Sequence, residues 1–476
     1  MPDETTIPWA RGGLPVIGHL LPLLKDPLSF LDSLPAQGDL VRVGVGPVSA
    51  VVVCDPELNH QVLVNDRLFD KGGMLFDRLR EVVGYGLGTV PHDPHRLQRR
   101  MLQPAFVKSR LPGHAAIMVK EISKVVDIWQ DGQIVTDVPG VLHDLAGRIT
   151  TATMFTAPLP EPLLEELTDA LHVVMDSLIF RMATPHALAK IPTRGKRRYD
   201  SGGSRLRAAT GQLIDIYHQS DLEHDDVLSM LLSARDDDGR PLSQEQISNQ
   251  VLTMYIGGVE TVAVTVSWAL HFIACMPEIR ERLHHEVDAA LAGRNATWND
   301  LPQLPYTRAI ISETLRIRPP GWVLTRITTA DTELGGHFLP AGTTVIYSPY
   351  LMHRRVDIYP TPTAFDPDRW DTRHTPAPPH GAYVPFALGA RRCIGDTFGT
   401  TEAMLIVSSI AARWHLHPHG APVNPKPRTS LVPDQLDLRI TARTPAPAPY
   451  GTAGGITRPG VTPDTDRCPF TPENSA

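Results

Sequence analysis

Cys393 is the residue whose surroundings point most directly to chemistry. It lies in the run FALGARRCIG, residues 386–395, which offers no second metal ligand. A structural zinc site needs four ligands and is therefore not indicated. A single thiolate can instead be the only protein ligand of a haem iron, where it donates electron density and favours O–O cleavage. An inert cysteine buried beside a glycine turn is the plainer alternative.

The neighbours of Cys393 suit a thiolate that faces a flat macrocycle. Gly389 and Gly395 carry no side chain, so the backbone can lie close to a planar group. Arg391 and Arg392 offer positive charges to haem propionates or to a partner surface. A helix that begins directly after Cys393 would stabilise the thiolate with its free N–H groups and its dipole.

A second candidate site is the run GGVET, residues 257–261. Glycine inside a helix costs about 1 kcal/mol relative to alanine, so the two glycines need a reason. Close packing of helices is one reason, and a local bulge that makes room for a ligand is the other. Glu260 and Thr261 then place a carboxylate beside a hydroxyl, a combination that can deliver protons.

Two further runs combine charges at helical spacing. Glu313 and Arg316 stand three residues apart and would share one helix face. For an isolated pair of this kind, a surface ion pair worth under ~1 kcal/mol is the plain interpretation. His95 and Arg99 stand four residues apart, so both would point from one face of a basic helix.

Taken together and in their order, these motifs resemble the cytochrome P450 family. Residues 386–395 match its FxxGxRxCxG signature without a gap, and residues 257–261 resemble its oxygen-activation motif. Residues 313–316 resemble its ExxR helix, and residues 95–106 resemble its propionate-binding helix. The resemblance covers nearly the whole chain up to Arg439.

The resemblance implies a role for each motif. Cys393 would be the thiolate ligand of haem b, which is iron protoporphyrin IX. Thr261 would hydrogen-bond dioxygen, and Glu260 would help to relay protons. The residues that would contact the cofactor are His95, Arg99, Gly258, Arg326, Phe386, Gly389, Arg391 and Gly395. The residues that would brace the region behind the haem are Glu313, Arg316 and Arg369.

The composition limits the class of protein. The chain has 476 residues, which suits one large enzyme domain and leaves no room for a fused reductase. Its formal net charge of −7 argues against bulk nucleic-acid binding. Its four cysteines are scattered without a CxxC motif, as expected in a reducing compartment. No run of 18 apolar residues predicts a membrane span, so we expect a cytoplasmic protein.

The elements that must position these motifs are predicted to be mainly helices with small β-sheets. Two β-rich runs, residues 39–45 and 49–54, predict a hairpin. A capping box at residues 243–246 begins an apolar helix that continues to Cys275, where Pro277 follows. At 1.5 Å per residue, a helix of roughly 32 residues would span about 48 Å and cross the core over a buried haem.

The remaining pattern is less regular. We expect short strands at residues 332–336 and 343–347, and an irregular Pro-rich stretch at residues 371–379. Residues 1–443 would form one haem-thiolate domain. Residues 444–476 are rich in Pro, Gly and Thr and poor in large apolar side chains, which predicts a disordered tail.

The segments expected above the haem are mostly apolar, which suits a hydrocarbon substrate. The predicted pocket residues are Leu75, Phe76, Phe180, Met254, Trp322, Val323 and Leu324. Residues 322–326, 332–336 and 347–350 also resemble actinobacterial sesquiterpene oxygenases. The resemblance therefore implies a monooxygenase that inserts one oxygen atom from O2 into a cyclic terpene in bacterial secondary metabolism.

Two other functions remain open from the sequence. A polyketide or macrolide tailoring hydroxylase would keep the haem but would need more hydrogen-bonding groups in the pocket. A haem sensor or ligand-binding protein without turnover would not need the Glu260–Thr261 pair. For the oxygenase, the resemblance implies a monomer that receives electrons from a ferredoxin and its NAD(P)H-dependent reductase. Cations near Arg100 and Arg392 could dock an acidic ferredoxin.

Overall fold

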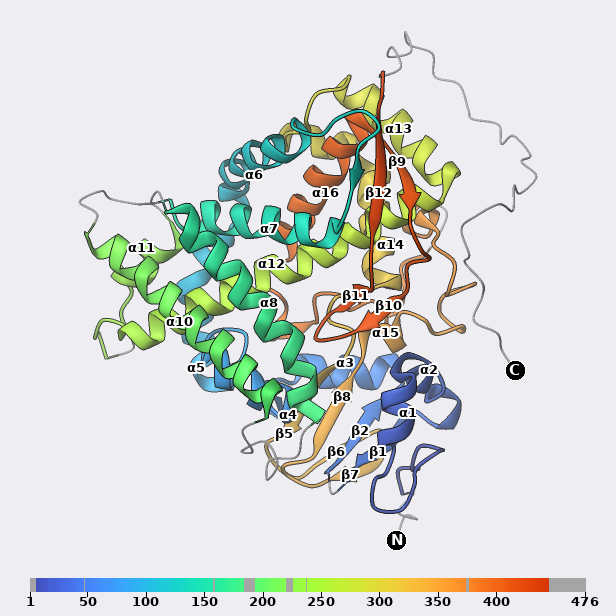
Figure 1. Ribbon diagram of the computed structural model, residues 1–476. Coiled ribbons are helices and arrows are strands. Elements are labelled where there is room, and N and C mark those ends of the chain that lie inside the picture. Colours follow the sequence, from blue (N-terminus) through green and yellow to red (C-terminus); the bar gives the residue numbers. More distant parts are fainter. Residues whose placement is uncertain are drawn as a thin grey trace.

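The computed structural model describes residues 6–46, 48–156, 159–183, 193–219, 226–236, 238–373 and 376–444. Helices dominate this part of the chain, and the strands form four small sheets, which confirms the predicted fold class (Figure 1). The predicted disordered tail lies outside the described residues from position 445 onward.

The helices give the molecule most of its mass. The first half of the chain contains α1 (Leu20–Lys25), α2 (Pro27–Asp32), α3 (Pro56–Val64), α4 (Met74–Val83), α5 (His92–Leu102), α6 (Leu111–Val126), α7 (Val138–Met154), α8 (Glu161–Ala183) and α10 (Arg194–Gln219). The second half contains α11 (Val227–Ser233), α12 (Gln244–Cys275), α13 (Pro277–Leu291), α14 (Pro305–Ile317), α15 (Pro349–Met352) and α16 (Asp396–Arg413). Short 3-10 helices are η1 (Pro35–Gln37), η2 (Gln103–Phe106), η3 (Lys108–Arg110), η4 (Trp298–Gln303), η5 (Pro367–Trp370) and η6 (Gly389–Arg391).

The largest sheet has the strand order β1-β2-β8-β5-β3. β1 (Leu40–Val45) and β2 (Val48–Val53) form the predicted antiparallel hairpin, and β2 runs parallel to β8 (Thr344–Tyr347). β8 pairs antiparallel with β5 (Leu324–Thr328), which reaches β3 (Phe69–Asp70). The sheet therefore joins two distant parts of the chain, residues 40–70 and 324–347, and the second carries the predicted cofactor contact Arg326 on β5.

The other sheets are smaller. One has three strands, β4 (Ile134–Val135), β12 (Asp437–Ala442) and β9 (Trp414–His419). The other two are hairpins, β6 (Thr332–Leu334) with β7 (His337–Leu339), and β10 (Pro425–Pro427) with β11 (Leu431–Pro433). β6 and β8 lie in the two short runs that the sequence predicted as strands.

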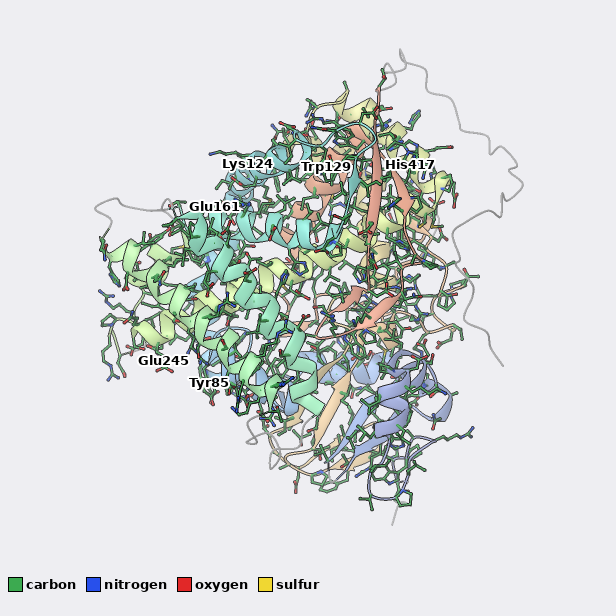
Figure 2. The ribbon with its side chains drawn as sticks, in the orientation of Figure 1. Tyr85, Lys124, Trp129, Glu161, Glu245 and His417 are labelled. Carbon is green, nitrogen blue, oxygen red and sulfur yellow. The ribbon has the colours of Figure 1, made fainter. Side chains whose placement is uncertain are left out.

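α12 is the central element of the fold, and its predicted capping box and end are confirmed. The Ser243 hydroxyl accepts from the Gln246 N–H, and the Gln246 side chain accepts from the Ser243 N–H. The first turn, with Glu245, lies at the edge of the molecule, and the rest contacts α7, α10, α14 and α16 (Figures 1 and 2). Its apolar stretch is long enough to cross a membrane, but most of it is buried inside the protein. α12 is a continuous α-helix through residues 257–261, without the bulge that was one explanation for its glycines.

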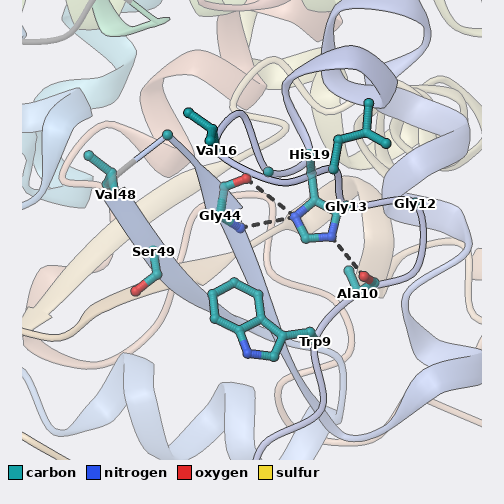
Figure 3. Close-up of a pocket in the computed structure, with 12 residues that line it drawn as sticks. Trp9, Ala10, Gly12, Gly13, Val16, His19, Gly44, Val48 and Ser49 are labelled. Carbon is teal, nitrogen blue, oxygen red and sulfur yellow. Dashed lines mark hydrogen bonds between the residues drawn. The ribbon is translucent and has the colours of Figure 1, made fainter.

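A surface hollow of about 570 Å³ lies where the N-terminal segment packs on the β1–β2 hairpin (Figure 3). His19 holds this region together. Its Nε2 hydrogen-bonds to the Ala10 carbonyl oxygen at 2.7 Å, and its Nδ1 accepts from the Gly44 N–H at 3.1 Å. Both ring nitrogens therefore have structural roles, and none of the residues that line the hollow is a predicted site residue.

Candidate active site

The loop that carries Cys393 is closed by its own backbone. The Cys393 N–H donates to the Phe386 carbonyl oxygen at 2.9 Å, and Gly395 is the N-cap of α16, the helix expected to follow the thiol. Burial raises the pKa of the Cys393 thiol, and a hydrogen bond from Gly395 offsets this in part. The side chain is nevertheless accessible. A group that is densely surrounded by protein and still accessible faces an internal space.

The two glycines of this loop have different roles. Gly389 has a φ of +67°, and a Cβ there would lie 2.9 Å from the Leu63 carbonyl oxygen at the end of α3. The approach of α3 therefore requires Gly389, whereas the sequence assigned it to the cofactor. A Cβ at Gly395 would meet Phe106 at 4.0 Å, so this position is open.

One face of α12 is accessible although the middle of the helix is enclosed by protein. Gly257 and Thr261, one turn apart, are accessible, while Val259, Glu260 and Val262 are buried. Thr261 Oγ1 donates to the Gly257 carbonyl oxygen at 2.8 Å, so the hydroxyl oxygen remains able to accept a hydrogen bond. This face also opens on an internal space.

The thiol and the hydroxyl belong to segments that touch. A Cβ at Gly399, in the first turn of α16, would lie 3.5 Å from Val262, which follows Thr261 on α12. α12 and α16 also contact one another elsewhere. Cys393, just before α16, and Thr261 on α12 therefore belong to two elements that pack against each other.

Gly258, which the sequence assigned to the cofactor, lies against α7. A Cβ there would lie 2.7 Å from Thr150 Oγ1 on α7, closer than real side chains allow. The glycine lets α12 pack tightly on α7, which was the alternative explanation. Gly257, where a Cβ would have no atom within 4 Å, is the glycine that borders the internal space.

Glu260 faces α7 rather than the accessible face of α12. Its Oε2 lies 2.7 Å from Nε2 of His143, and both side chains are buried. Burial raises the pKa of Glu260, but the hydrogen bond and charge of His143 outweigh it and lower the pKa below its usual value. Burial lowers the pKa of His143, but Glu260 raises it overall. Each group thus favours the charged form of the other, the imidazolium of His143 and the carboxylate of Glu260.

A group of cations, here called the cation cluster, gathers beside the Cys393 loop. Its members are Lys71, His95, Arg99, Arg326 and Arg391. Arg326 is buried, and its Nε and Nη1 have no hydrogen-bond partner among the described residues. Burial and the charges of Arg326 and Arg391 hold the pKa of Lys71 well below its usual value. Burial, Arg391 and Lys71 lower the pKa of His95 to about 3. Buried positive charge of this density is stable only beside an anion.

Three members of the cation cluster are engaged by the protein itself, which the sequence did not predict. Lys71 Nζ donates to the Gly88 carbonyl oxygen at 2.6 Å. Arg391 donates to Asp66 at 3.1 Å and to Asp70 at 2.6 Å. Arg99 donates to two carbonyl oxygens of the loop around Cys393, at 3.2 and 2.6 Å. Both arginines therefore fix the loop, and the unpartnered donors belong to Arg326. Lys71 escaped the sequence analysis because it belongs to none of the motifs.

The residues of the predicted brace form one buried network. Arg316 donates from Nε and Nη2 to the two oxygens of Glu313, each at 2.8 Å, and neither side chain is exposed. Arg369 Nε donates to Glu313 Oε1 at 3.3 Å, and Trp370 Nε1 donates to Oε2 at 3.1 Å. Arg316 also donates to the His353 carbonyl oxygen at 2.8 Å. The ion pair is therefore an internal joint between α14 and the segment around η5, not a surface pair.

Most of the predicted pocket residues are buried or half-buried, namely Leu75, Phe76, Met254, Trp322, Val323 and Leu324. Phe76 lies close to the cation cluster, with its ring centre 5.2 Å from Lys71 Nζ. Trp322 packs into the core of the N-terminal region, and its indole N–H donates to the Arg428 carbonyl oxygen at 2.7 Å. The side chain of Phe180 lies outside the described residues.

The residues fit a haem. The accessible thiol could ligate an iron, and the unpartnered donors of Arg326 could bind a propionate. Fold and site together define a haem-thiolate protein. The model of the cytochrome P450 family matches residues 8–440, and the chain belongs to that family. It is a monooxygenase of a family that binds haem through a cysteine thiolate.

Named relatives agree with this class. The chain is 41% identical over 438 residues to pentalenene oxygenase from Streptomyces avermitilis, which covers 92% of this chain and 97% of that protein. It is 40% identical over 417 residues to cyclooctat-9-en-7-ol 5-monooxygenase from Streptomyces melanosporofaciens, covering 86% and 90%. It is 39% identical over 433 residues to cyclooctatin synthase from the same species, covering 90% and 94%. The predicted resemblance to actinobacterial terpene oxygenases is confirmed.

Proposed function

We propose that this monooxygenase inserts one oxygen atom from O2 into a cyclic terpene, with haem b held by Cys393. The observation that carries the proposal is a thiol enclosed by protein and yet accessible. The relatives support the substrate class, because two of them are named for oxygenation of pentalenene and of cyclooctat-9-en-7-ol, which are terpenes.

Haem, when bound, supplies the redox-active iron that activates dioxygen. Cys393 would hold the iron as a thiolate, because a metal keeps a coordinating thiol deprotonated. Arg99 would keep the loop in place through its two carbonyl contacts. Arg326 would bind a propionate with Nε and Nη1. The negative charge of the propionate would also favour the protonated forms of Lys71 and His95, whose pKa values are otherwise lowered.

On the opposite side, Thr261 would hydrogen-bond dioxygen or a water molecule. Its hydroxyl is accessible and already donates to Gly257, so its oxygen is oriented to accept a further hydrogen bond. Glu260 would act as the acid that supplies protons to this face. Open space beside Gly257 leaves room for the small molecules that this step needs.

The substrate would bind against apolar side chains that exclude water. The proposed lining residues are Leu75, Phe76, Phe180, Met254, Trp322, Val323 and Leu324. Glu313, Arg316 and Arg369 would keep the region behind the haem rigid, because their buried ion pairs tie α14 to the segment around η5.

Electrons would reach the haem from a ferredoxin and its NAD(P)H-dependent reductase in the cytoplasm, and the enzyme would act as a monomer. Arg392 is exposed, lies next to Cys393 and pairs with Asp396 at 2.6 Å. Together with Arg100 it would attract an acidic ferredoxin to this face. Electron transfer should then slow as the ionic strength rises, because salt screens exposed charges.

The proposal is tested with purified holoenzyme and two sets of ligands. The reduced carbon-monoxide complex should show the red-shifted Soret band of a thiolate ligand, and Cys393→His should lose it. Cyclic terpene hydrocarbons should shift the spin state of the ferric enzyme and yield a product that is heavier by one oxygen atom, whereas a macrolide should do neither. A persistent band in Cys393→His, or a spin-state shift with the macrolide alone, would overturn the respective half of the proposal.

A further inference from the structure

The partner of Glu260 adds a residue to the proposed reaction. His143 lies on α7, 117 residues before Glu260 in the chain, and pairs with it in the interior. We propose that His143 is the proton donor that reloads Glu260 after each delivery of a proton to the accessible face of α12. The inference rests on the proposed function, in which Glu260 is the acid beside Thr261.

The hydrogen bonds of His143 fix how many protons the pair holds. Its Nδ1 lies 2.8 Å from the Pro139 carbonyl oxygen, which can only accept, so Nδ1 carries a hydrogen in every charge state. Its Nε2 lies 2.7 Å from Glu260 Oε2, and one proton occupies that contact. With the proton on Nε2 the pair is charged, and with the proton on Oε2 both groups are neutral. Both states keep the hydrogen bond, so the transfer does not break a contact.

The groups around the pair favour a single proton shared between His143 and Glu260. The groups that face it from α7, α8 and the β10–β11 turn are Asp137, Asp144, His172, Asp176 and Ser430. The ring of His172 meets that of His143 edge to face, with 4.6 Å between the centres. Burial and the charge of His143 lower the pKa of His172, which disfavours a second cation beside His143. A hydrogen bond with Ser430 favours the carboxylate form of Glu260.

The proposed step conserves charge and atoms. The proton moves from His143 Nε2 to Glu260 Oε2, which leaves a neutral imidazole and a neutral carboxylic acid. The protonated Glu260 side chain is then no longer attracted by the charge of His143. It turns toward the open space at Gly257 and gives its proton to the face of α12 that carries Thr261. Glu260 returns as a carboxylate, and His143 takes one proton from water. Asp144, which follows His143 in the chain, is exposed to solvent.

The first test does not depend on turnover. Nitrogen-15 NMR of labelled histidines, in the reduced carbon-monoxide complex of the holoenzyme, follows the protonation of His143. We expect His143 to remain an imidazolium at a pH where His172 is neutral, and Glu260→Gln should lower the His143 midpoint by at least one pH unit. An unchanged midpoint in Glu260→Gln would overturn the proposal.

The second test separates proton donation from simple support of Glu260. His143→Gln keeps a neutral donor for the carboxylate but cannot act as an acid. It should lower the product formed per NAD(P)H consumed about a hundredfold, in the range of general acid catalysis, and should remove the pH dependence of this ratio. Substrate binding, seen as the spin-state shift, should be unchanged. The matched control is His271→Gln, a buried histidine on α12 that lies near Cys275, and it should retain the wild-type ratio.

The outcomes distinguish this inference from the function on which it rests. Coupling is here the product formed per NAD(P)H consumed. One outcome is that Glu260→Gln and Thr261→Ala lose coupling while His143→Gln keeps both the wild-type coupling and its pH profile. In that case His143 is not the donor, and the proposed function stands. If all three variants keep coupling, the proton relay of the proposed function is wrong as well. If His143→Gln fails to bind haem, the NMR midpoint in Glu260→Gln still decides the proposal.

Discussion

The brace and the cation cluster each contain a fully buried arginine, and the two arginines differ in their partners. Arg316 is 0% and Arg326 is 1% exposed. The donors of Arg316 reach both oxygens of Glu313 and several backbone carbonyl oxygens. Nε and Nη1 of Arg326 reach no acceptor among the described residues. The protein completes the first network by itself and leaves the second to be completed by an anion.

This difference predicts opposite dependence on the cofactor. A network that the protein closes should stabilise the chain with or without haem, because all of its partners are side chains and backbone. The unpartnered donors of Arg326 should lower the free energy of unfolding of the haem-free protein. They should raise it in the haem-bound protein, where a carboxylate can accept their hydrogen bonds. The predictions below test this contrast, from the largest expected effect to the smallest.

The brace should give the largest loss. Glu313→Ala removes the carboxylate and leaves the charge of Arg316 buried without its partner, which should lower the free energy of unfolding by about 3–5 kcal/mol. The loss should appear in both haem-free and haem-bound protein, measured by urea denaturation. Asp368→Ala is the control, because Asp368 pairs with Arg282 through two hydrogen bonds on the exposed surface. It should cost less than ~1 kcal/mol, and an equal loss in the two variants would contradict the internal role of the brace.

Arg326→Met should have opposite effects in the two forms. Without haem, it removes buried donors that have no acceptor, so the free energy of unfolding should rise by about 1–3 kcal/mol. With haem, it removes a propionate partner, so retention of haem against transfer to a haem-binding acceptor protein should weaken about tenfold, or about 1.4 kcal/mol. Arg280→Met on α13 is the control and should leave haem retention unchanged. Destabilisation of the haem-free form by Arg326→Met would show that Arg326 serves packing instead.

Acid should weaken the brace through His353. This side chain is buried, its Nε2 accepts from the Val384 N–H at 2.9 Å, and burial followed by the charge of Arg316 lowers its pKa from 6.5 to about 3. Between pH 6.5 and 3, His353 is protonated in the unfolded chain but stays neutral in the folded protein. The free energy of unfolding therefore falls as the pH falls toward 3. At pH 5.5 the loss from this group should be about 1.4 kcal/mol relative to pH 7.5. His353→Gln, compared by urea midpoints at the two pH values, should remove that part of the slope, and an unchanged slope would assign it to other groups.

The sequence predicted what depends on local pattern. The bounds of α12 followed from Ser243, Gln246 and Pro277, which act within a few residues of the helix ends. The spacing of Glu313 and Arg316 likewise sets their contact, because both stand on one helix face. These features are determined by residues close together in the sequence, so they can be predicted without the rest of the fold.

The rest of the site depends on contacts between distant segments. His143 became the partner of Glu260 because α7 packs on α12, and no spacing in the chain signals that contact. Lys71 joins the cation cluster because it follows β3, which pairs with the strand of Arg326. The rotation of α12 about its axis also decides whether Gly257 or Gly258 faces α7. The local sequence does not specify this rotation, because it depends on how α12 packs on other helices.

The smallest effects should come from those two glycines, and their signs should differ. Gly257→Ala places a methyl group where no atom lies within 4 Å, so the haem-free protein should gain about 1 kcal/mol from helix propensity. Gly258→Ala places the same group 2.7 Å from Thr150 Oγ1, and overpacking of this kind costs about 1–3 kcal/mol, which exceeds the gain. Thermal or urea unfolding of the two haem-free variants checks the signs. In the holoenzyme, Gly257→Ala should be the variant that lowers the product formed per NAD(P)H consumed. Its methyl group enters the space that Thr261 borders, whereas the methyl group at residue 258 points to α7. Equal signs in stability, or a coupling defect confined to Gly258→Ala, would mean that α12 presents the other glycine to the internal space.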